Sequence, residues 1–124
     1  DFMAVRRTRD VWIRYERDVL PGIEAADQEF LSNRLSRYPQ LSVDPDVIGA
    51  PFEGPSLILA GRQDSTAGYR DIWNVLEKYP RATFAVLDGA GHNLQTEQVG
   101  LFETLAAEWL DRVNLELTKE QAPA

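Results

Sequence analysis

Two short apolar runs set the tightest limit on how this chain can fold. The first, SLILA at 56–60, is bounded by proline and glycine, and the second, ATFAVL at 82–87, is rich in β-branched and aromatic residues. Runs of this length and composition are typical of buried strands. Between them, apolar residues recur at helical spacing over 67–79. A strand, a crossover helix and a second strand predict a right-handed βαβ unit with parallel strands, and therefore an α/β fold.

The residues before this unit are predicted to be helical. Apolar residues recur at helical spacing over 4–19 and again over 23–37, and we expect Pro21 and Gly22 to end the first helix. The stretch 39–55 is rich in proline and glycine, which is typical of a linker or a long loop.

The chain is therefore expected to have two parts. Residues 1–50 form a helical segment with its linker, and residues 51–124 form an α/β part that ends in an amphipathic helix over 101–113. Parallel sheets normally contain several strands with both faces covered, but only two runs here are convincing strands. At least one apolar strand edge would stay unpaired, which is a liability for a free monomer.

Composition narrows the classes of partner. Twenty acidic and thirteen basic side chains give a net charge of −7, so nucleic acid is not an expected partner. No apolar run approaches the roughly 18 residues needed to span a bilayer, so a membrane is not an expected partner either. The sequence has no cysteine, which excludes disulfides and thiolate sites and fits a cytoplasmic location. With a single histidine and no phosphate-binding loop, we expect no metal and no cofactor.

Two polar side chains follow the predicted strands at similar distances. Asp64 lies four residues after Ala60, and His92, the only histidine, lies five residues after Leu87. Because the carboxyl ends of parallel strands meet at one edge of a sheet, both loops are expected to open at the same place. A carboxylate that accepts the Nδ1 proton of an imidazole orients the ring and stabilises its protonated form. From spacing alone, this catalytic interpretation competes evenly with a surface histidine and an aspartate that caps a turn.

Residues 55–113 resemble the C-terminal part of α/β-hydrolase fold enzymes. The segments that carry the resemblance are PSLILAGRQD, TFAVLDGAGHNLQTEQ and LFETLAAEWLDRV. In that family a strand followed by G-x-x-D supplies the acid of a catalytic triad, a pattern that Gly61 and Asp64 match. A strand followed by G-A-G-H supplies the base, a pattern that His92 matches. The resemblance implies that Asp64 and His92 are catalytic.

Two further details belong to this resemblance. The family pattern often continues G-H-x-x-x-x-E-x-P; Glu97 fits it, whereas Val99 stands where proline is common. The family also inserts a helical lid before the acid-bearing strand, and residues 1–50 occupy that position.

The triad member that this sequence does not contain is the nucleophile. The family's serine lies in a G-x-S-x-G turn between a strand and a helix, and none of the five serines here lies in such a pentapeptide. Ser65 directly follows Asp64 and is expected to cap the helix over 67–79. The resemblance thus implies a C-terminal fragment of a serine hydrolase that transfers an acyl group from an ester or similar small carbonyl compound to water. We expect the chain alone to be inactive.

A non-catalytic function is the alternative. Two copies could pair their unpaired strand edges and bury their apolar faces, so the chain would act as a self-associating assembly or binding module. Either function is compatible with a homo-oligomer or a strand-paired assembly.

Overall fold

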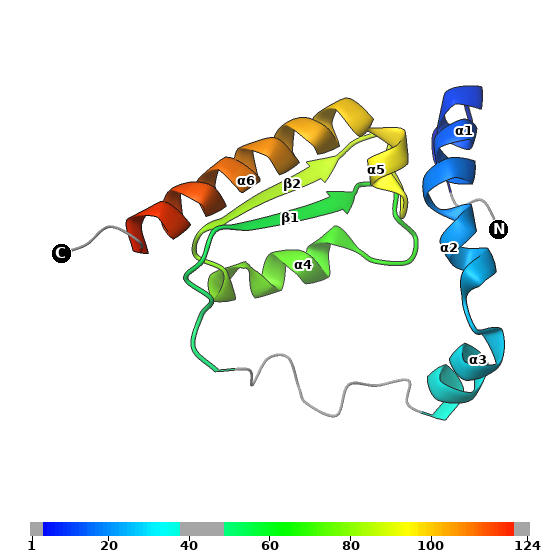
Figure 1. Ribbon diagram of the computed structural model, residues 1–124, viewed down its shortest axis with the longest axis horizontal. Helices are drawn as coiled ribbons and strands as arrows, with labels where there is room; N and C mark the ends of the chain where they lie inside the picture. Colours follow the sequence, from blue (N-terminus) through cyan, green and yellow to red (C-terminus); the bar gives the residue numbers. More distant parts are fainter. Residues whose placement is uncertain (1–3, 38–48, 121–124) are drawn as a thin grey trace. The chain divides into compact units, whose positions relative to one another are not determined.

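The computed structural model of the chain describes residues 4–37 and 49–120, which belong to two compact units (Figure 1). The helical unit spans Thr8–Gly49, and the sheet-containing unit combines Asp1–Arg7 with Ala50–Ala124. Residues 4–7 therefore group with the sheet, although the sequence pattern assigns them to the helical segment.

The described part of the helical unit consists of α1 (Arg9–Asp18), α2 (Leu20–Ala25) and α3 (Gln28–Arg37). Thr8 caps α1, because its hydroxyl oxygen accepts the backbone N–H of Val11 at 3.3 Å. The prediction that Pro21 and Gly22 end the first helix is wrong, since α1 ends earlier and both residues lie in α2. Proline is tolerated in a first helical turn, where its missing N–H would have had no partner within the helix.

The single helix predicted over 23–37 is interrupted at Ala26, whose backbone is extended. Asp27 starts the new helix: its Oδ1 accepts the backbone N–H of Phe30 at 2.8 Å. An aspartate at this position satisfies a donor that the first helical turn leaves free. The linker predicted over 39–55 lies in its larger part outside the described residues.

In the described residues, the sheet consists of two parallel strands joined by a helix (Figure 1). Strand β1 (Ser56–Gly61) pairs with β2 (Ala82–Leu87), with Ser56 opposite Ala82 and Gly61 opposite Leu87. The connection runs through α4 (Tyr69–Val75) and a 3₁₀ helix, η2 (Leu76–Lys78). The predicted pair of parallel strands with flanking helices is confirmed.

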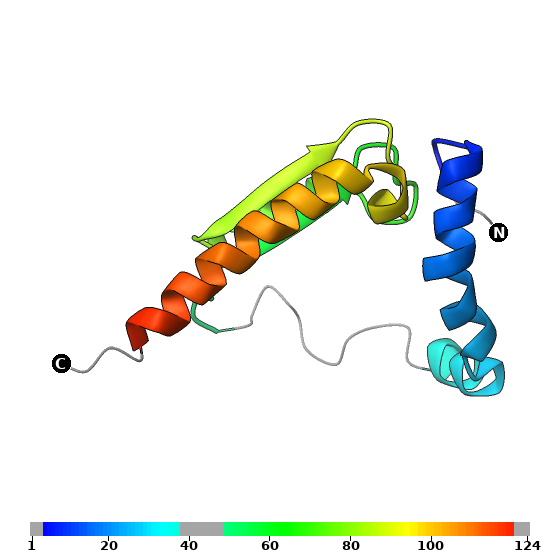
Figure 2. The same ribbon diagram turned by 45° about the horizontal axis from the view of Figure 1, so that its top comes forward.

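Helices cover both faces of this sheet. After β2 come α5 (Leu94–Glu97) and α6 (Val99–Glu120), so the last helix is longer than the predicted 101–113. Figure 1 shows α4 and α6 on opposite sides of the strands, and Figure 2 shows α6 running along the face of the sheet turned toward the viewer. On the α6 side, Trp109 Nε1 donates to the carbonyl of Pro55 at 2.9 Å. On the α4 side, the ring centroids of Trp73 and Phe84 are 6.1 Å apart.

Arg112 connects α6 to the amino-terminal ends of both strands. Its guanidinium donates to the carbonyl of Arg81 at 3.0 Å and to the hydroxyl of Thr83 at 2.9 Å, and it pairs with Glu108 at 2.7 Å. These bonds fix the helix along the sheet at the end opposite to the loops that carry Asp64 and His92. None of the helices in the described ranges has both the length and the apolar character that crossing a bilayer requires.

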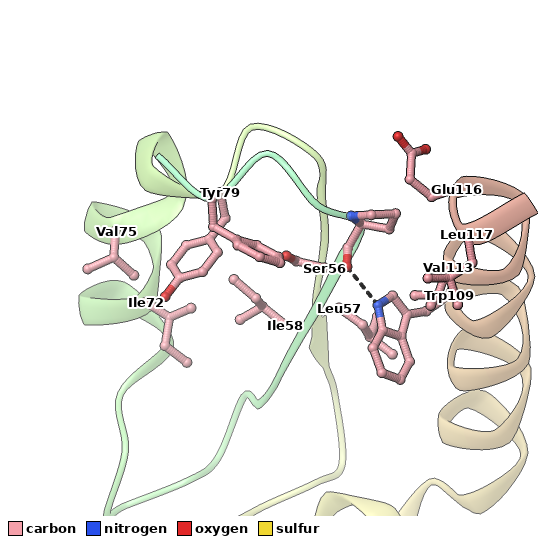
Figure 3. A pocket seen from close by; sticks show the side chains of 12 residues that line it. Ser56, Leu57, Ile58, Ile72, Val75, Tyr79, Trp109, Val113, Glu116 and Leu117 are labelled. Carbon is pink, nitrogen blue, oxygen red and sulfur yellow. Dashed lines mark hydrogen bonds between the residues drawn. The ribbon is translucent and has the colours of Figure 1, made fainter. Parts of the chain in front are cut away.

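The outer edge of β1 borders an apolar cavity of about 740 Å³ (Figure 3). The N–H of Ser56 and that of Arg62 bond to the β2 side, so the alternate residues Leu57 and Leu59 direct their backbone groups away from β2. Ile72 of α4 and Trp109 of α6 wall the cavity from either side. Within residues 4–37 and 49–120, the outer edge of β1 is thus a row of backbone groups without a strand partner, between two apolar walls.

Candidate active site

Residues 62–68, which we call the acid loop because they include Asp64, connect β1 to α4. The N–H of Asp64 bonds back to the carbonyl of Gly61 at 3.2 Å, which closes a tight turn. Asp64 Oδ1 then accepts the backbone N–H groups of Thr66 at 2.7 Å and Ala67 at 3.1 Å. The expected cap by Ser65 is wrong: α4 begins only at Tyr69, and no side chain caps it. Asp64 itself supplies the acceptor that this turn needs.

Residues 88–93, which we call the base loop because they include His92, connect β2 to α5 and turn back over the strand ends. Gly89 has φ +65°, a left-handed conformation that glycine adopts without steric cost. Pairing between the two segments continues beyond the strands, because the N–H of Arg62 bonds to the carbonyl of Leu87 at 2.9 Å and that of Gln63 to Ala90 at 3.0 Å. The acid and base loops are therefore bonded directly to each other.

The two loops bring Asp64 and His92 into contact, so their expected proximity is confirmed. Asp64 Oδ2 lies 3.2 Å from His92 Nδ1. An ionised carboxylate can only accept, so Nδ1 carries the proton and Nε2 is the basic nitrogen of the neutral ring. Within residues 4–37 and 49–120, Nε2 has no hydrogen-bond partner. The carboxylate is buried, with 7% of its side chain exposed, whereas 44% of the imidazole is exposed.

The environment of Asp64 favours its charged form. Burial acts to raise the pKa of this carboxyl, but the N–H groups of Thr66 and Ala67, together with His92, outweigh burial and lower its pKa below the usual value. Asp64 is accordingly an ionised acceptor at neutral pH. A permanent negative charge at this place is what stabilises a neighbouring imidazole when it takes up a proton.

Gln63 links the two loops a second time. Its Nε2 donates to Asp88 Oδ1 at 2.7 Å, and its Oε1 accepts the N–H of Ala90 at 3.3 Å. The bond from Gln63, followed by that from the Gly89 N–H, lowers the pKa of Asp88. Asp88 therefore serves to hold the two loops together.

The loops approach each other so closely that only glycine fits at the end of β1. A Cβ atom on Gly61 would lie 2.3 Å from the carbonyl oxygen of Gly91 and 2.6 Å from that of Ala90. Steric crowding thus explains why the first residue of the G-x-x-D pattern is glycine here, since any side chain at this position would push the base loop away.

A third carboxylate, that of Glu97, contacts the base loop; Glu97 fits the family pattern, but no role was assigned to it from the sequence. Its side chain belongs to a residue that is only 3% exposed, and it accepts the N–H of Gly91, the residue before His92, at 2.6 Å. The same carboxylate also accepts two N–H groups from the first residues of the chain. No local signal could have revealed these partners, because they are more than ninety positions away in sequence.

The described residues contain no group of three or more histidine, aspartate or glutamate side chains placed to hold a metal ion. The chain was also compared with known protein families, curated proteins and solved structures, and no match was found in any of the three.

Proposed function

We propose that the chain carries the acid and base of a serine-type α/β-hydrolase. The observation that carries the proposal is the contact between the buried Asp64 Oδ2 and His92 Nδ1, which leaves Nε2 without a partner in the described structure. The order of the two residues and the loops that bear them also agree with the resemblance drawn from the sequence.

In the complete enzyme, Nε2 of His92 would take the proton of a serine hydroxyl as its oxygen attacks the carbonyl carbon of an ester. Asp64 would stabilise the imidazolium that forms. The imidazolium would then return the proton to the leaving alkoxide, giving an alcohol and an acyl-enzyme. A water molecule, deprotonated in turn by Nε2, would release the acid and regenerate the serine.

The attacking serine would come from outside the 124 residues. The sequence contains no G-x-S-x-G turn, and no serine in the described residues hydrogen bonds to His92. Ser56 lies within β1 and donates to the carbonyl of Gly54 at 3.2 Å. Residues 1–50 would form part of a helical lid over the substrate, which we take to be an ester or similar small carbonyl compound.

Two measurements test this function. The isolated chain should hydrolyse a simple aryl ester no faster than its His92→Ala variant, because the nucleophile is not present. An encoded product that extends far enough before Asp1 to include a G-x-S-x-G turn should hydrolyse the ester, and His92→Ala or Asp64→Asn should lower its kcat by about 10⁴-fold. Ester turnover that survives His92→Ala, or an upstream region without such a turn, would exclude the proposed function.

A second candidate function is self-association through β1, which the cavity at its edge favours (Figure 3). The backbone groups of Leu57 and Leu59, which have no strand partner among the described residues, can pair with a strand, and the walls on both sides can receive its apolar side chains. A strand with the composition of β1 itself, SLILAG, meets both requirements. Two chains would then pair β1 with β1 in a symmetric dimer.

Light scattering and sedimentation equilibrium distinguish this function from the first. The chain should form dimers, and Leu57→Lys, which places a charge in the cavity, should weaken dimerisation by at least about tenfold. Leu115→Lys is the matched control, because Leu115 is exposed on α6 and does not line the cavity. A chain that stays monomeric over the whole concentration range would rule out assembly through this edge.

A further inference from the structure

Glu97 is a buried carboxylate whose oxygens accept three backbone N–H groups. Oε1 accepts those of Val5 at 2.5 Å and Arg6 at 2.7 Å, and Oε2 accepts that of Gly91 at 2.6 Å. With only 3% of the residue exposed, water cannot replace these partners. Short bonds to a buried charge are among the stronger hydrogen bonds in proteins, so the three segments that meet here are held firmly.

One of these segments is the base loop itself. Gly91 directly precedes His92, and Ala90 beside it is completely buried. The bond from Gly91 to Glu97 therefore fixes the backbone from which the imidazole projects. Asp64 holds the ring itself, through Nδ1.

The second segment, residues 4–7, leads into α1. Its contact with Glu97 brings it against the base loop, and a Cβ on Gly89 would lie only 2.9 Å from the Arg6 guanidinium Nε. The base loop thus contacts this segment twice, once through the shared carboxylate and once through Arg6. Glu97 connects Val5 and Arg6, which belong to the sheet-containing unit, to the loop that carries His92.

We propose that Glu97 is a positioning residue for His92: its carboxylate holds the Gly91 N–H, and thereby keeps the imidazole aimed at Asp64. The inference rests on the proposed function in so far as His92 is the base. It adds a third carboxylate that acts through the backbone and does not touch the reacting atoms.

Glu97→Gln distinguishes the contact with Gly91 from the contacts with Val5 and Arg6. A glutamine has one acceptor oxygen in place of two, and its amide nitrogen can only donate. The oxygen gains two bonds when it faces Val5 and Arg6, but one bond when it faces Gly91. The amide nitrogen should therefore face the Gly91 N–H, which loses its acceptor while the other two keep theirs.

Nuclear magnetic resonance of the ¹⁵N-labelled chain can test this selectively, because His92 is the only histidine. In Glu97→Gln, hydrogen exchange at the Gly91 amide should become at least about tenfold faster, while Val5 and Arg6 keep their protection. At a pH where the ring is neutral, the fraction of the tautomer protonated at Nδ1 should also fall. Glu97→Ala should release all three amides.

Thr96→Val is the control for a general loosening of α5. Thr96 is 1% exposed, and its hydroxyl donates to the carbonyl of Asn93 at 2.9 Å. This variant should leave the tautomer of His92 as in the wild type. If Glu97→Gln leaves both Gly91 exchange and the tautomer unchanged, or if Thr96→Val changes the tautomer equally, the positioning role is overturned.

The experiment also separates this inference from the proposed function. A wild-type ring that is not protonated at Nδ1 would contradict the acid–base pair. A response of the Gly91 amide and of the ring signals to Glu97→Gln would still support the positioning of the loop in that case.

Discussion

Replacing Gly61 with alanine tests how the acid and base loops are held together. The added Cβ would lie 2.3 Å from the carbonyl oxygen of Gly91 and 2.8 Å from the carbonyl carbon of Ala90. Backbone atoms cannot rotate away as a flexible side chain can, so the loops would have to separate by about 1 Å to reach ordinary van der Waals contact. Overpacking of this kind typically costs 1–3 kcal/mol, and the rigid neighbours place Gly61→Ala at about 2–3 kcal/mol.

Gly100→Ala is the matched control, and it should change the free energy of unfolding in the opposite direction. Nothing lies within 4 Å of a Cβ at this position, which is in the first turn of α6. Alanine there restricts the unfolded chain and favours the helix, so stability should rise by about 0.5 kcal/mol.

Urea unfolding followed by far-ultraviolet circular dichroism measures both variants. The Gly61→Ala chain should also show a smaller fraction of the His92 tautomer protonated at Nδ1, because the base loop moves away from Asp64. A loss of less than about 0.5 kcal/mol for Gly61→Ala would refute the close approach of the loops, since surface substitutions stay within that range.

Three further predictions concern the same unit. The pKa of Asp64 is lower in the folded protein than in the unfolded chain. The ionised carboxylate therefore stabilises the fold above about pH 4, and this stabilisation is lost as the pH falls through the folded pKa. In urea titrations, the difference in stability between the wild type and Asp64→Asn should shrink on acidification. Arg112→Met should lower the free energy of unfolding by about 2–3 kcal/mol. Arg17→Met, which removes an exposed pair with the adjacent aspartate, should leave the free energy of unfolding unchanged. Trp109→Phe should cost about 1 kcal/mol, measured by the same titration, because the bond to the Pro55 carbonyl is lost; an unchanged midpoint would contradict it.

The strands were the most predictable part of the fold. The run SLILA is followed by Gly61, and β1 includes this glycine, while β2 covers the predicted 82–87. Short apolar runs between proline and glycine leave few alternatives. The helix boundaries before them were less predictable, because Pro21 is compatible both with the end of one helix and with the first turn of the next.

The site was predictable where it depends on topology. Parallel strands place the ends of β1 and β2 side by side, so the proximity of Asp64 and His92 follows from their spacing after each strand. The partners of Glu97 and the cap of the acid turn were not predictable, because each depends on which nearby acceptor a particular N–H meets in space. Ser65 and Asp64 are adjacent in sequence, and only the folded turn shows that Asp64 is the acceptor.

The hydrogen bonds that join the acid and base loops have a consequence for how such a site can diversify. Because the N–H of Arg62 and that of Gln63 continue the strand pairing into the base loop, the spacing of acid and base is a local property of one βαβ cassette. Under the proposed function, substitutions elsewhere would change the attacking group or the substrate pocket and leave the contact between Asp64 and His92 in place.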